Sequence, residues 1–202
     1  MLTYVKDVNE QKRKIDSLYE VYPLLKILDE KDKHLRKISD EVVFPLSDKE
    51  KQLIKQIIEN ITYSQIESLA EKYKLRPGMG LAFPQVAINK RVIVIVHEYE
   101  DGKFDNYVVV NPKIVSHSEE IIATDAGEGC LSVNRDVEGH VKRFVRVTIE
   151  GFDEHGNKLK IRAREELSIA FQHEIDHLNG ILFVDKIDKD NPYKGADIYR
   201  PI

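Results

Sequence analysis

Two histidines four residues apart, with a glutamate directly after the first, lie in the segment FQHEIDHLNGILF, residues 171–183. On a helix, residues i and i+4 share one face, so His173 and His177 can both direct a ring nitrogen at a single metal ion. Glu174 points in another direction and can reach a water on that ion without binding the ion itself. A metal ion held this way lowers the pKa of a water next to a proton carrier. The segment therefore predicts a hydrolytic metal site, and a solvated helix with two unrelated histidines is the simpler alternative.

The third protein ligand that a catalytic zinc-type site usually has is not obvious from this segment. After His177 the chain contains no further His, Glu or Cys, and aspartates are the only downstream carboxylates. Upstream, Cys130 in DAGEGCLSVNR offers a sulfur ligand that suits iron or zinc. A single cysteine is more often a small buried residue, so both interpretations stay open. The unfilled coordination position favours Cys130 as a ligand.

Composition restricts the class of protein. The chain has 202 residues, a formal net charge of −4 and one cysteine, and its pI is about 6.0. A single cysteine excludes an intrachain disulfide and favours a reducing compartment, and the overall charge gives no reason to expect a basic nucleic-acid footprint. The first twenty residues are too charged for a signal peptide, and the longest strongly apolar run, VIVIV at 92–96, is too short to span a bilayer. We therefore expect a cytoplasmic protein without a membrane segment.

Helix and strand signals alternate along the chain. SDKE, residues 47–50, has capping-box spacing, and apolar residues then recur at helical spacing, which predicts a helix that continues to about Leu75 and ends at RPGMG. Strand patterns follow in RVIVIVHE, YVVVNPKIV, EEIIATD, VKRFVRVTIEGF and KLKIRA. A last helix is predicted from about Arg164 to Gly180. The order predicts an α+β fold, with antiparallel β-sheets packed around a C-terminal metal-binding helix and a long N-terminal helix.

The expected domain organisation has two parts. Residues 1–33 are rich in Lys, Asp and Glu and are predicted to be an N-terminal extension packed on or beside the body. Residues 34–202 are predicted to be a single catalytic metallohydrolase domain.

Three motifs together resemble those of peptide deformylase. They are GMGLAFPQ (residues 78–85), EGCLS (residues 128–132) and QHEIDH (residues 172–177), and their order and spacing also fit. The stretch from EGCLSVNRDVEGHVKRF to QHEIDHLNGILFVDKI is similar to the longer deformylases of Gram-positive bacteria. The resemblance covers roughly residues 34–188 and is specific because three motifs coincide, whereas HEIDH alone would indicate only a metal hydrolase.

The resemblance implies a role for each matching residue. Cys130, His173 and His177 would be ligands of one divalent metal ion, ferrous in the cell, with Zn²⁺, Ni²⁺ or Co²⁺ as alternatives in purified protein. Glu174 would be general base and acid. Gln85 and the backbone N–H of Leu131 would hold the formyl oxygen of the substrate, and Gly80 would present its backbone to the peptide. The substrate would be a newly synthesised polypeptide that begins with formyl-methionine.

Other positions carry secondary expectations. Glu128 and Arg143 are expected to pair and to fix the segment that carries Cys130. Ile169, Phe171 and Val133 are candidates for an apolar pocket around the methionine side chain. Phe83 stands where the family usually has alanine, and it could narrow the cleft beside Gln85 or face the core.

Two other functions compete with deformylation. A metallopeptidase of the HExxH type is the nearer one, but it would need a downstream Glu or His ligand. An inactive, metal-stabilised protein that grips nascent chains is the other, although a structural site needs no base such as Glu174. The expected partners are formyl-methionyl nascent chains, with the ribosome as a candidate for residues 1–33. No direct nucleic-acid readout is expected, and a monomer is the default.

Overall fold

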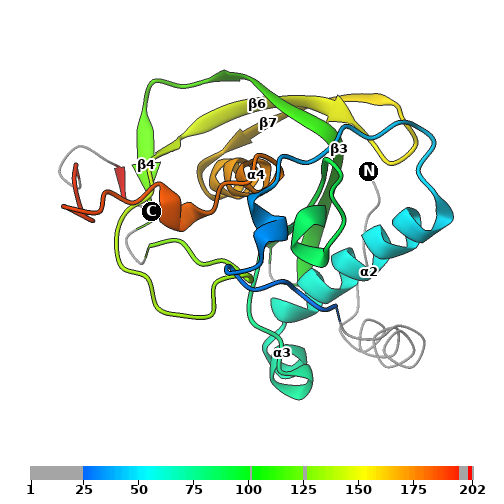
Figure 1. Ribbon diagram of the computed structural model, residues 1–202, viewed down its shortest axis with the longest axis horizontal. Helices are drawn as coiled ribbons and strands as arrows, with labels where there is room; N and C mark the ends of the chain where they lie inside the picture. The colour runs from blue at the N-terminus through cyan, green and yellow to red at the C-terminus, as the bar shows by residue number, and fades with distance from the viewer. Residues whose placement is uncertain (1–24, 101, 125–126, 196–199, 202) are drawn as a thin grey trace.

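A five-stranded antiparallel sheet is the framework of the protein in the computed structural model (Figure 1), which describes residues 25–100, 102–124, 127–195 and 200–201. Its strands are, in spatial order, β1 (Gly80–Ala82), β2 (Val92–Glu100), β3 (Lys103–His117), β6 (Arg146–Phe152) and β7 (Lys158–Arg164). A second sheet has the order β5 (Arg143–Phe144), β4 (Ile121–Ala123) and β8 (Arg200–Pro201). The predicted α+β fold is confirmed, with one addition: β4 and β8 pair in parallel.

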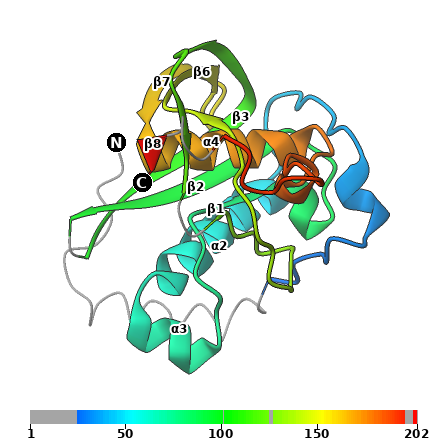
Figure 2. The ribbon, with the colours of Figure 1, turned by 90° about the vertical axis from the view of Figure 1, so that its left-hand side faces the viewer.

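The apolar run of β2 lies between two helices, which explains why it has no polar residue. Val92, Val94 and Val96 pack in one core cluster with the isoleucines of α2 (Asp48–Ser64). The intervening Ile93 and Ile95 pack in a second cluster with residues of α4 (Glu165–Leu178). Successive side chains of a strand point to opposite faces, so each face of β2 is covered by a different helix, as Figure 2 shows.

The predicted N-terminal helix is two helices. The capping box forms, since the Ser47 hydroxyl accepts a hydrogen bond from the Glu50 N–H and the Glu50 carboxylate accepts one from the Ser47 N–H. The helix ends at Ser64, about eleven residues before the predicted end near Leu75, and α3 (Glu67–Tyr73) follows after a break at Gln65 and Ile66. The break has a tertiary cause, because the Gln65 side chain donates a hydrogen bond to the Val96 carbonyl of β2.

Helix α4 lies in the middle of the molecule and ends as predicted. It contacts β1, β2, β5, β6 and β7, and it is buried from Ser168 to Leu178. Gly180 follows its C-terminus with a φ of +73°, a conformation that glycine adopts without strain. A helix buried this completely can hold polar side chains only if they are paired or serve a site.

The strand predicted over VKRFVRVTIEGF is divided between the two sheets. Arg143 and Phe144 form β5, and the chain enters β6 at Arg146. Between them, the Val145 N–H donates to the Glu120 carbonyl, and the Val145 carbonyl accepts from the Glu165 N–H. Val145 therefore links the second sheet to the start of α4.

Part of the predicted extension lies against the body. The Leu28 N–H donates to the Gln85 carbonyl, and the Glu30 N–H donates to the Ser132 carbonyl. Residues 1–24 lie outside the described part of the chain, so the division at residue 33 stays a prediction. No helix among the described residues is long and apolar enough to cross a membrane.

Candidate active site

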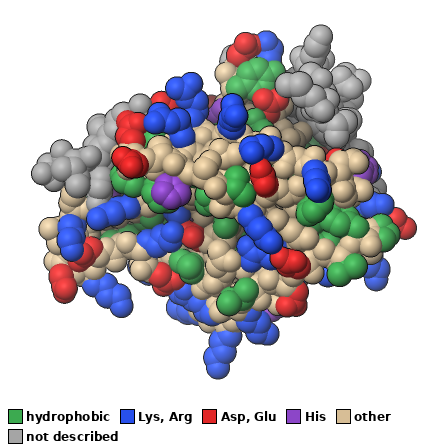
Figure 3. Space-filling model, turned by 90° about the horizontal axis from the view of Figure 1, so that it is seen from above, with side chains coloured by type: hydrophobic (Ala, Val, Ile, Leu, Met, Phe, Trp, Pro, Cys, Tyr) green, Lys and Arg blue, Asp and Glu red, His purple; other side chains and the backbone are tan. Residues whose placement is uncertain are grey.

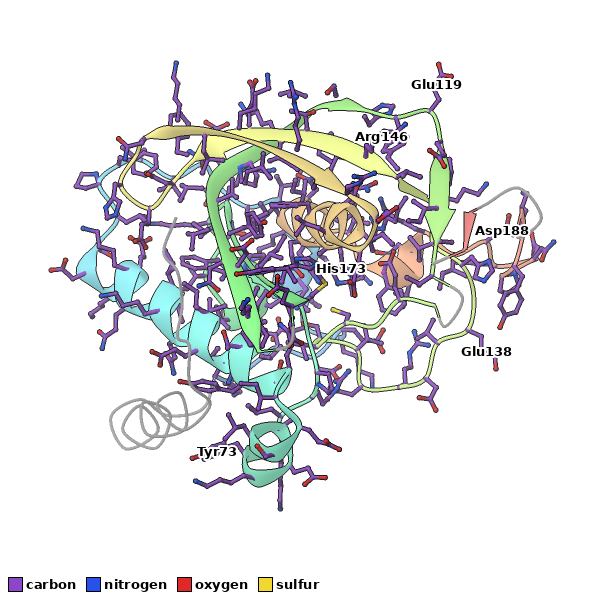
Figure 4. All side chains as sticks on the ribbon, turned by 180° about the vertical axis from the view of Figure 1, so that it is seen from behind. Tyr73, Glu119, Glu138, Arg146, His173 and Asp188 are labelled. Carbon is purple, nitrogen blue, oxygen red and sulfur yellow. The ribbon has the colours of Figure 1, made fainter. Side chains whose placement is uncertain are left out.

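The three predicted metal ligands come together in the interior. Helix α4 supplies His173 and His177 one turn apart, and the loop after β4 brings Cys130 to them. One ligand atom from each residue lies within 4.8 Å of the other two, and the Cys130 Sγ lies 3.3 Å from the His177 Nε2. Figure 4 shows His173, a residue of α4, in the interior of the molecule. The structure therefore places Cys130 where a third ligand beside His173 and His177 would have to lie.

The donor set fits a divalent transition metal. All three residues are buried, and two imidazole nitrogens with one sulfur form a set typical of zinc or iron sites. Burial alone would lower the pKa of His173, but hydrogen bonds to Cys130 and Glu128 raise it to about 10, which reveals a strongly negative field at this ring. Burial lowers the pKa of His177 well below its usual value, which favours the neutral imidazole that a metal ligand needs.

Glu174 lies beside the ligands in the state expected of a proton carrier. Its side chain is buried, and its Oε2 atom has no hydrogen-bond partner among the described residues. Burial raises the pKa of Glu174 to about 7. A buried carboxyl group with a free oxygen and a pKa near neutrality can both accept and donate a proton.

The side chain of Glu174 occupies the space that a side chain at residue 80 would need. A Cβ atom at residue 80 would lie 2.7 Å from the Glu174 Oε1 and 2.9 Å from its Cγ. Any side chain at residue 80 would therefore force the Glu174 side chain to move from this place. Steric contact with Glu174 therefore gives Gly80 a role that the sequence did not indicate.

An ion-pair network supports His173 and the Cys130 loop. The Glu128 carboxylate accepts two hydrogen bonds from Arg143, at 2.7 and 2.8 Å, and lies 3.0 Å from the His173 Nδ1. Arg143 also donates to Asp176 at 2.5 Å. Burial would raise the pKa of Glu128, but these hydrogen bonds outweigh it and lower the pKa to about 2. The predicted pairing of Glu128 with Arg143 is confirmed. Glu128 holds the His173 Nδ1, so the Nε2 is the ring nitrogen on the side of Cys130.

Gln85 and Leu131 offer N–H groups near the ligands. The Gln85 Oε1 accepts a hydrogen bond from the Ala82 N–H at 2.8 Å, and this contact orients the amide. The Gln85 Nε2 lies 3.2 Å from the Ser132 Oγ and 3.7 Å from the Cys130 Sγ. No described group accepts a hydrogen bond from the Leu131 backbone N–H.

A cavity of about 280 Å³ opens onto these groups. Six of the seven predicted site residues line it, namely Gly80, Gln85, Cys130, Leu131, His173 and Glu174. His177 lies behind them and is 1% exposed. The cavity therefore opens onto two of the candidate ligands, onto the candidate proton carrier and onto both predicted donors.

The apolar part of the cavity differs from the sequence expectation. Of the three residues expected to form the methionine pocket, Ile169 lines the cavity. Phe171 packs in the core against Tyr107, and Val133 belongs to the small cluster that also holds Cys130, so neither of these two candidates lines the cavity. Met79, Leu131 and Ala170 line the cavity instead. Helical geometry explains Phe171, because it lies two residues from Ile169 and so faces away from it.

Phe83 faces the core. Its side chain is fully buried in the cluster between α2 and the sheet, and it is not among the residues that line the cavity. The larger side chain therefore does not narrow the cleft beside Gln85.

Arg76 is a residue of the site that the sequence analysis missed. Its guanidinium donates hydrogen bonds to the carbonyls of Cys130 and Val133, each at 2.9 Å, and to the Asn134 side chain at 2.5 Å. It thereby joins the glycine-rich loop to the Cys130 loop across the cavity. No spacing signal could identify it, because its partners are backbone carbonyls 54 to 57 residues away and an asparagine side chain 58 residues away.

The chain matches a known family and several known proteins. Residues 24–193 match the family described as polypeptide deformylase. The chain is 53% identical over 159 residues to a peptide deformylase of Listeria welshimeri, covering 78% of this chain and 86% of that protein. It is 43% identical over 176 residues to peptide deformylase 2 of Bacillus anthracis, covering 87% of this chain and 96% of that protein.

Solved structures agree with these sequence matches. A plant peptide deformylase is similar with a TM-score of 0.70 and 28% identity, over 87% of both chains. A probable peptide deformylase from Synechococcus phage S-SSM7 is similar with a TM-score of 0.66 and 39% identity, over 81% of this chain and 99% of that one.

Proposed function

We propose, from the premise that this chain belongs to the polypeptide deformylase family, that its buried centre removes the formyl group from the N-terminal formyl-methionine of newly synthesised polypeptides and releases formate. One observation carries the proposal. Beside one cavity, the structure brings together Cys130, His173 and His177 with the Glu174 carboxylate, whose Oε2 has no hydrogen-bond partner among the described residues.

The cofactor is one divalent metal ion held by Cys130, His173 and His177. We propose Fe²⁺ in the cell, with Zn²⁺, Ni²⁺ or Co²⁺ able to occupy the same ligands in purified protein. Such an ion would supply Lewis acidity, which polarises a carbonyl and makes water more acidic. Glu128 supports ligation because it holds the His173 Nδ1 and so directs the Nε2 at the metal.

Gln85 and Leu131 stabilise the negative charge that develops on the formyl oxygen. The amide of Gln85 is held in place by the Ala82 N–H, and the Leu131 N–H is free of acceptors among the described residues. Hydrogen-bond donors that are already in position stabilise the transition state most where water is excluded. Loss of one such donor raises the activation free energy by about 3 kcal/mol.

Glu174 moves the proton. It takes a proton from the water that attacks the formyl carbon and gives it to the amine nitrogen as the C–N bond breaks, which yields formate and a free N-terminus. Its pKa of about 7, raised by burial, supports both directions of transfer near neutral pH.

The peptide chain of the substrate lies along β1. This strand is at the edge of the five-stranded sheet, and Gly80 lines the cavity from it. Edge strands offer unpaired backbone groups to an extended peptide. Ile169, Met79 and Ala170 supply apolar surface for the methionine side chain.

The HExxH metallopeptidase alternative is not favoured, because the third candidate ligand is a cysteine upstream of the helix. We place the protein in the cytoplasm as a monomer that works near the ribosome, where formylated chains emerge.

Formate release from a formyl-Met tripeptide, measured with anaerobically purified and Fe²⁺-loaded protein, tests the function. Robust release is expected, and Glu174→Ala should abolish it while metal stays bound. Glu119→Ala, which removes an exposed acid, is the control and should retain full activity. Absence of release from folded, metal-loaded wild-type protein would contradict the proposal and favour the inactive binding protein, and cleavage of unformylated peptides would favour the peptidase.

A further inference from the structure

The outer face of β7 carries positive charge at every alternate position. The strand reads KLKIRAR, and Lys158, Lys160, Arg162 and Arg164 are exposed. The intervening Leu159, Ile161 and Ala163 face the core cluster that includes α4. Alternate residues of a strand lie about 7 Å apart, so the four cations form a row about 20 Å long.

An open hollow of about 480 Å³ lies at one end of this row. Its lining includes the three arginines Arg146, Arg162 and Arg164 with the hydroxyl residues Ser116 and Thr148, and no carboxylate lines it. Figure 3 views the molecule from this side, where Lys and Arg side chains are spread across the face among Asp and Glu side chains. The hollow therefore combines guanidinium groups with hydroxyl groups, which are both donors suited to phosphate oxygens.

The arginines of this hollow are poorly compensated within the protein. Arg146 pairs directly with Arg164 across β6 and β7, and like charges at such a position destabilise a sheet. Glu120 lies 3.5 Å from Arg146, while Arg162 and Arg164 form no ion pair with any described residue. Within the row on β7, Lys160 forms an ion pair with Glu150 at 2.8 Å.

Protection of an edge strand explains this arrangement only in part. Strand β7 is the last strand of its sheet, and charged side chains on edges prevent unwanted strand pairing. Charges of either sign would serve that purpose, and alternating signs would avoid the cost of facing Arg146 with Arg164. A row of one sign is what an anionic partner requires.

We propose that the face formed by Lys158, Lys160, Arg162, Arg164 and Arg146 docks on the phosphate backbone of RNA. A single phosphate cannot contact cations spread over about 20 Å, whereas a nucleic-acid backbone presents regularly spaced charges over that length. The inference rests on the proposed function, because formylated chains emerge from the ribosome, whose surface is largely RNA. Contacts to phosphates carry no sequence readout, in agreement with the sequence expectation of none.

Docking at this face would also orient the active site. Arg164 immediately precedes α4, and His173 lies nine residues further along the chain, a helical rise of about 14 Å. An RNA surface bound at the start of α4 would therefore hold the cavity close to that surface without covering β1 at the opposite edge of the sheet.

Binding of a fluorescently labelled 20-base-pair RNA duplex to the full-length, metal-loaded protein tests the proposal, with anisotropy measured between 50 and 200 mM salt. The variant Arg162→Gln/Arg164→Gln should bind at least tenfold more weakly, and its slope of log affinity against log salt should fall by about 2, one for each cation removed. Lys49→Gln/Lys55→Gln removes the same charge from α2, where both lysines are exposed, and should change affinity less than twofold. Lys158→Gln/Lys160→Gln is a second variant on the same strand and should act like the first.

Deformylation of a formyl-Met tripeptide by the same variants separates the two proposals. Activity should stay at the wild-type level in all of them, because none of these residues lines the cavity. Wild-type protein that fails to bind RNA, or β7 variants that bind it as well as the α2 control does, would overturn the docking proposal without affecting the enzymatic one. Tighter binding of polyglutamate than of RNA would overturn RNA as the partner and indicate an acidic protein.

Discussion

At the scale of single residues, the site depends on how a few buried charges are compensated. Arg143 has no exposed side-chain surface and lies between Glu128 and Asp176. Breaking such a buried pair usually destabilises a protein by about 3–5 kcal/mol, because one charge is left uncompensated. The same ion pairs therefore stabilise the fold and hold His173 in its orientation.

Replacing Glu128 should weaken metal binding. Glu128→Gln removes the negative charge that faces the His173 Nδ1, and loss of such a partner typically lowers metal affinity 10- to 100-fold. Competition with a chromophoric chelator measures this affinity, and circular dichroism checks that the variant is folded. Glu100→Gln, an exposed acid on β2, is the control, and equal affinity in the two variants would refute a supporting role for Glu128.

Adding one methyl group at Gly80 should impair catalysis. The Cβ atom of Gly80→Ala would lie 2.7 Å from the Glu174 Oε1, so the carboxylate must move. Displacement of a reacting group by about 1 Å can lower the rate about 100-fold, and we expect kcat to fall by that order while metal content is unchanged. Gly129→Ala adds the same group where no atom lies within 4 Å and should lose far less. Equal kcat values would show that Glu174 is not constrained by Gly80.

At the scale of elements, tertiary contacts decide where helices begin and end. The capping box starts α2 at its predicted position, yet the same helix stops at Ser64 because Gln65 bonds to β2. Glu50 has a second partner, Lys90, which lies just before β2. The first turn of α2 is therefore tied to the sheet.

The contribution of Glu50 to stability should depend on pH. Burial raises the pKa of Glu50, but hydrogen bonds from Lys90 and Ser47 outweigh it and hold the pKa below 4.5. Since the folded pKa is lower than the unfolded one, the stabilisation is present above about pH 4.5 and is lost as pH falls through the folded value. Glu50→Gln should lower the free energy of unfolding, measured with urea at pH 7, by about 1–3 kcal/mol. The loss should become progressively smaller towards pH 3. Asp48→Asn, in the same turn and exposed, should show little change, and a cost for Glu50→Gln that persists at pH 3 would contradict this account.

At the scale of the whole molecule, the candidate metal ligands come from parts of the chain that are far apart in the sequence. Cys130 lies in a loop without regular secondary structure, and its partners His173 and His177 lie on the central helix. A metal ion that binds only the folded chain stabilises it by mass action. The candidate site is therefore expected to contribute to folding as well as to catalysis.

Metal removal should lower the melting temperature. At a free metal concentration 100 times the Kd, binding contributes about 2.7 kcal/mol, which corresponds to about 5–10 °C for a chain of this size. Calorimetry with and without chelator measures the shift. Cys130→Ser should reduce the metal-dependent part of it, and a melting temperature that does not respond to chelator would argue against the ligand set.

The sequence by itself determined the kind of chemistry and the main elements. The i and i+4 spacing of His173 and His177 holds on any helix, and the capping box and Gly180 act within one turn, so local rules were sufficient for them. The third ligand could be narrowed to Cys130 by elimination and by resemblance to a family, but its contact with the helix is a tertiary fact.

Only the tertiary structure decided the features that depend on distant partners. Arg76 contacts carbonyls more than fifty residues away, Phe171 and Phe83 face the core instead of the cavity, and Asp176 completes the ion-pair network. The net charge of −4 concealed the row of cations on β7, because a sum over the chain contains no information on which side chains share a face. Local sequence patterns determine the secondary structure and the candidate chemistry of each segment. Packing determines which distant segments contribute side chains to the same site.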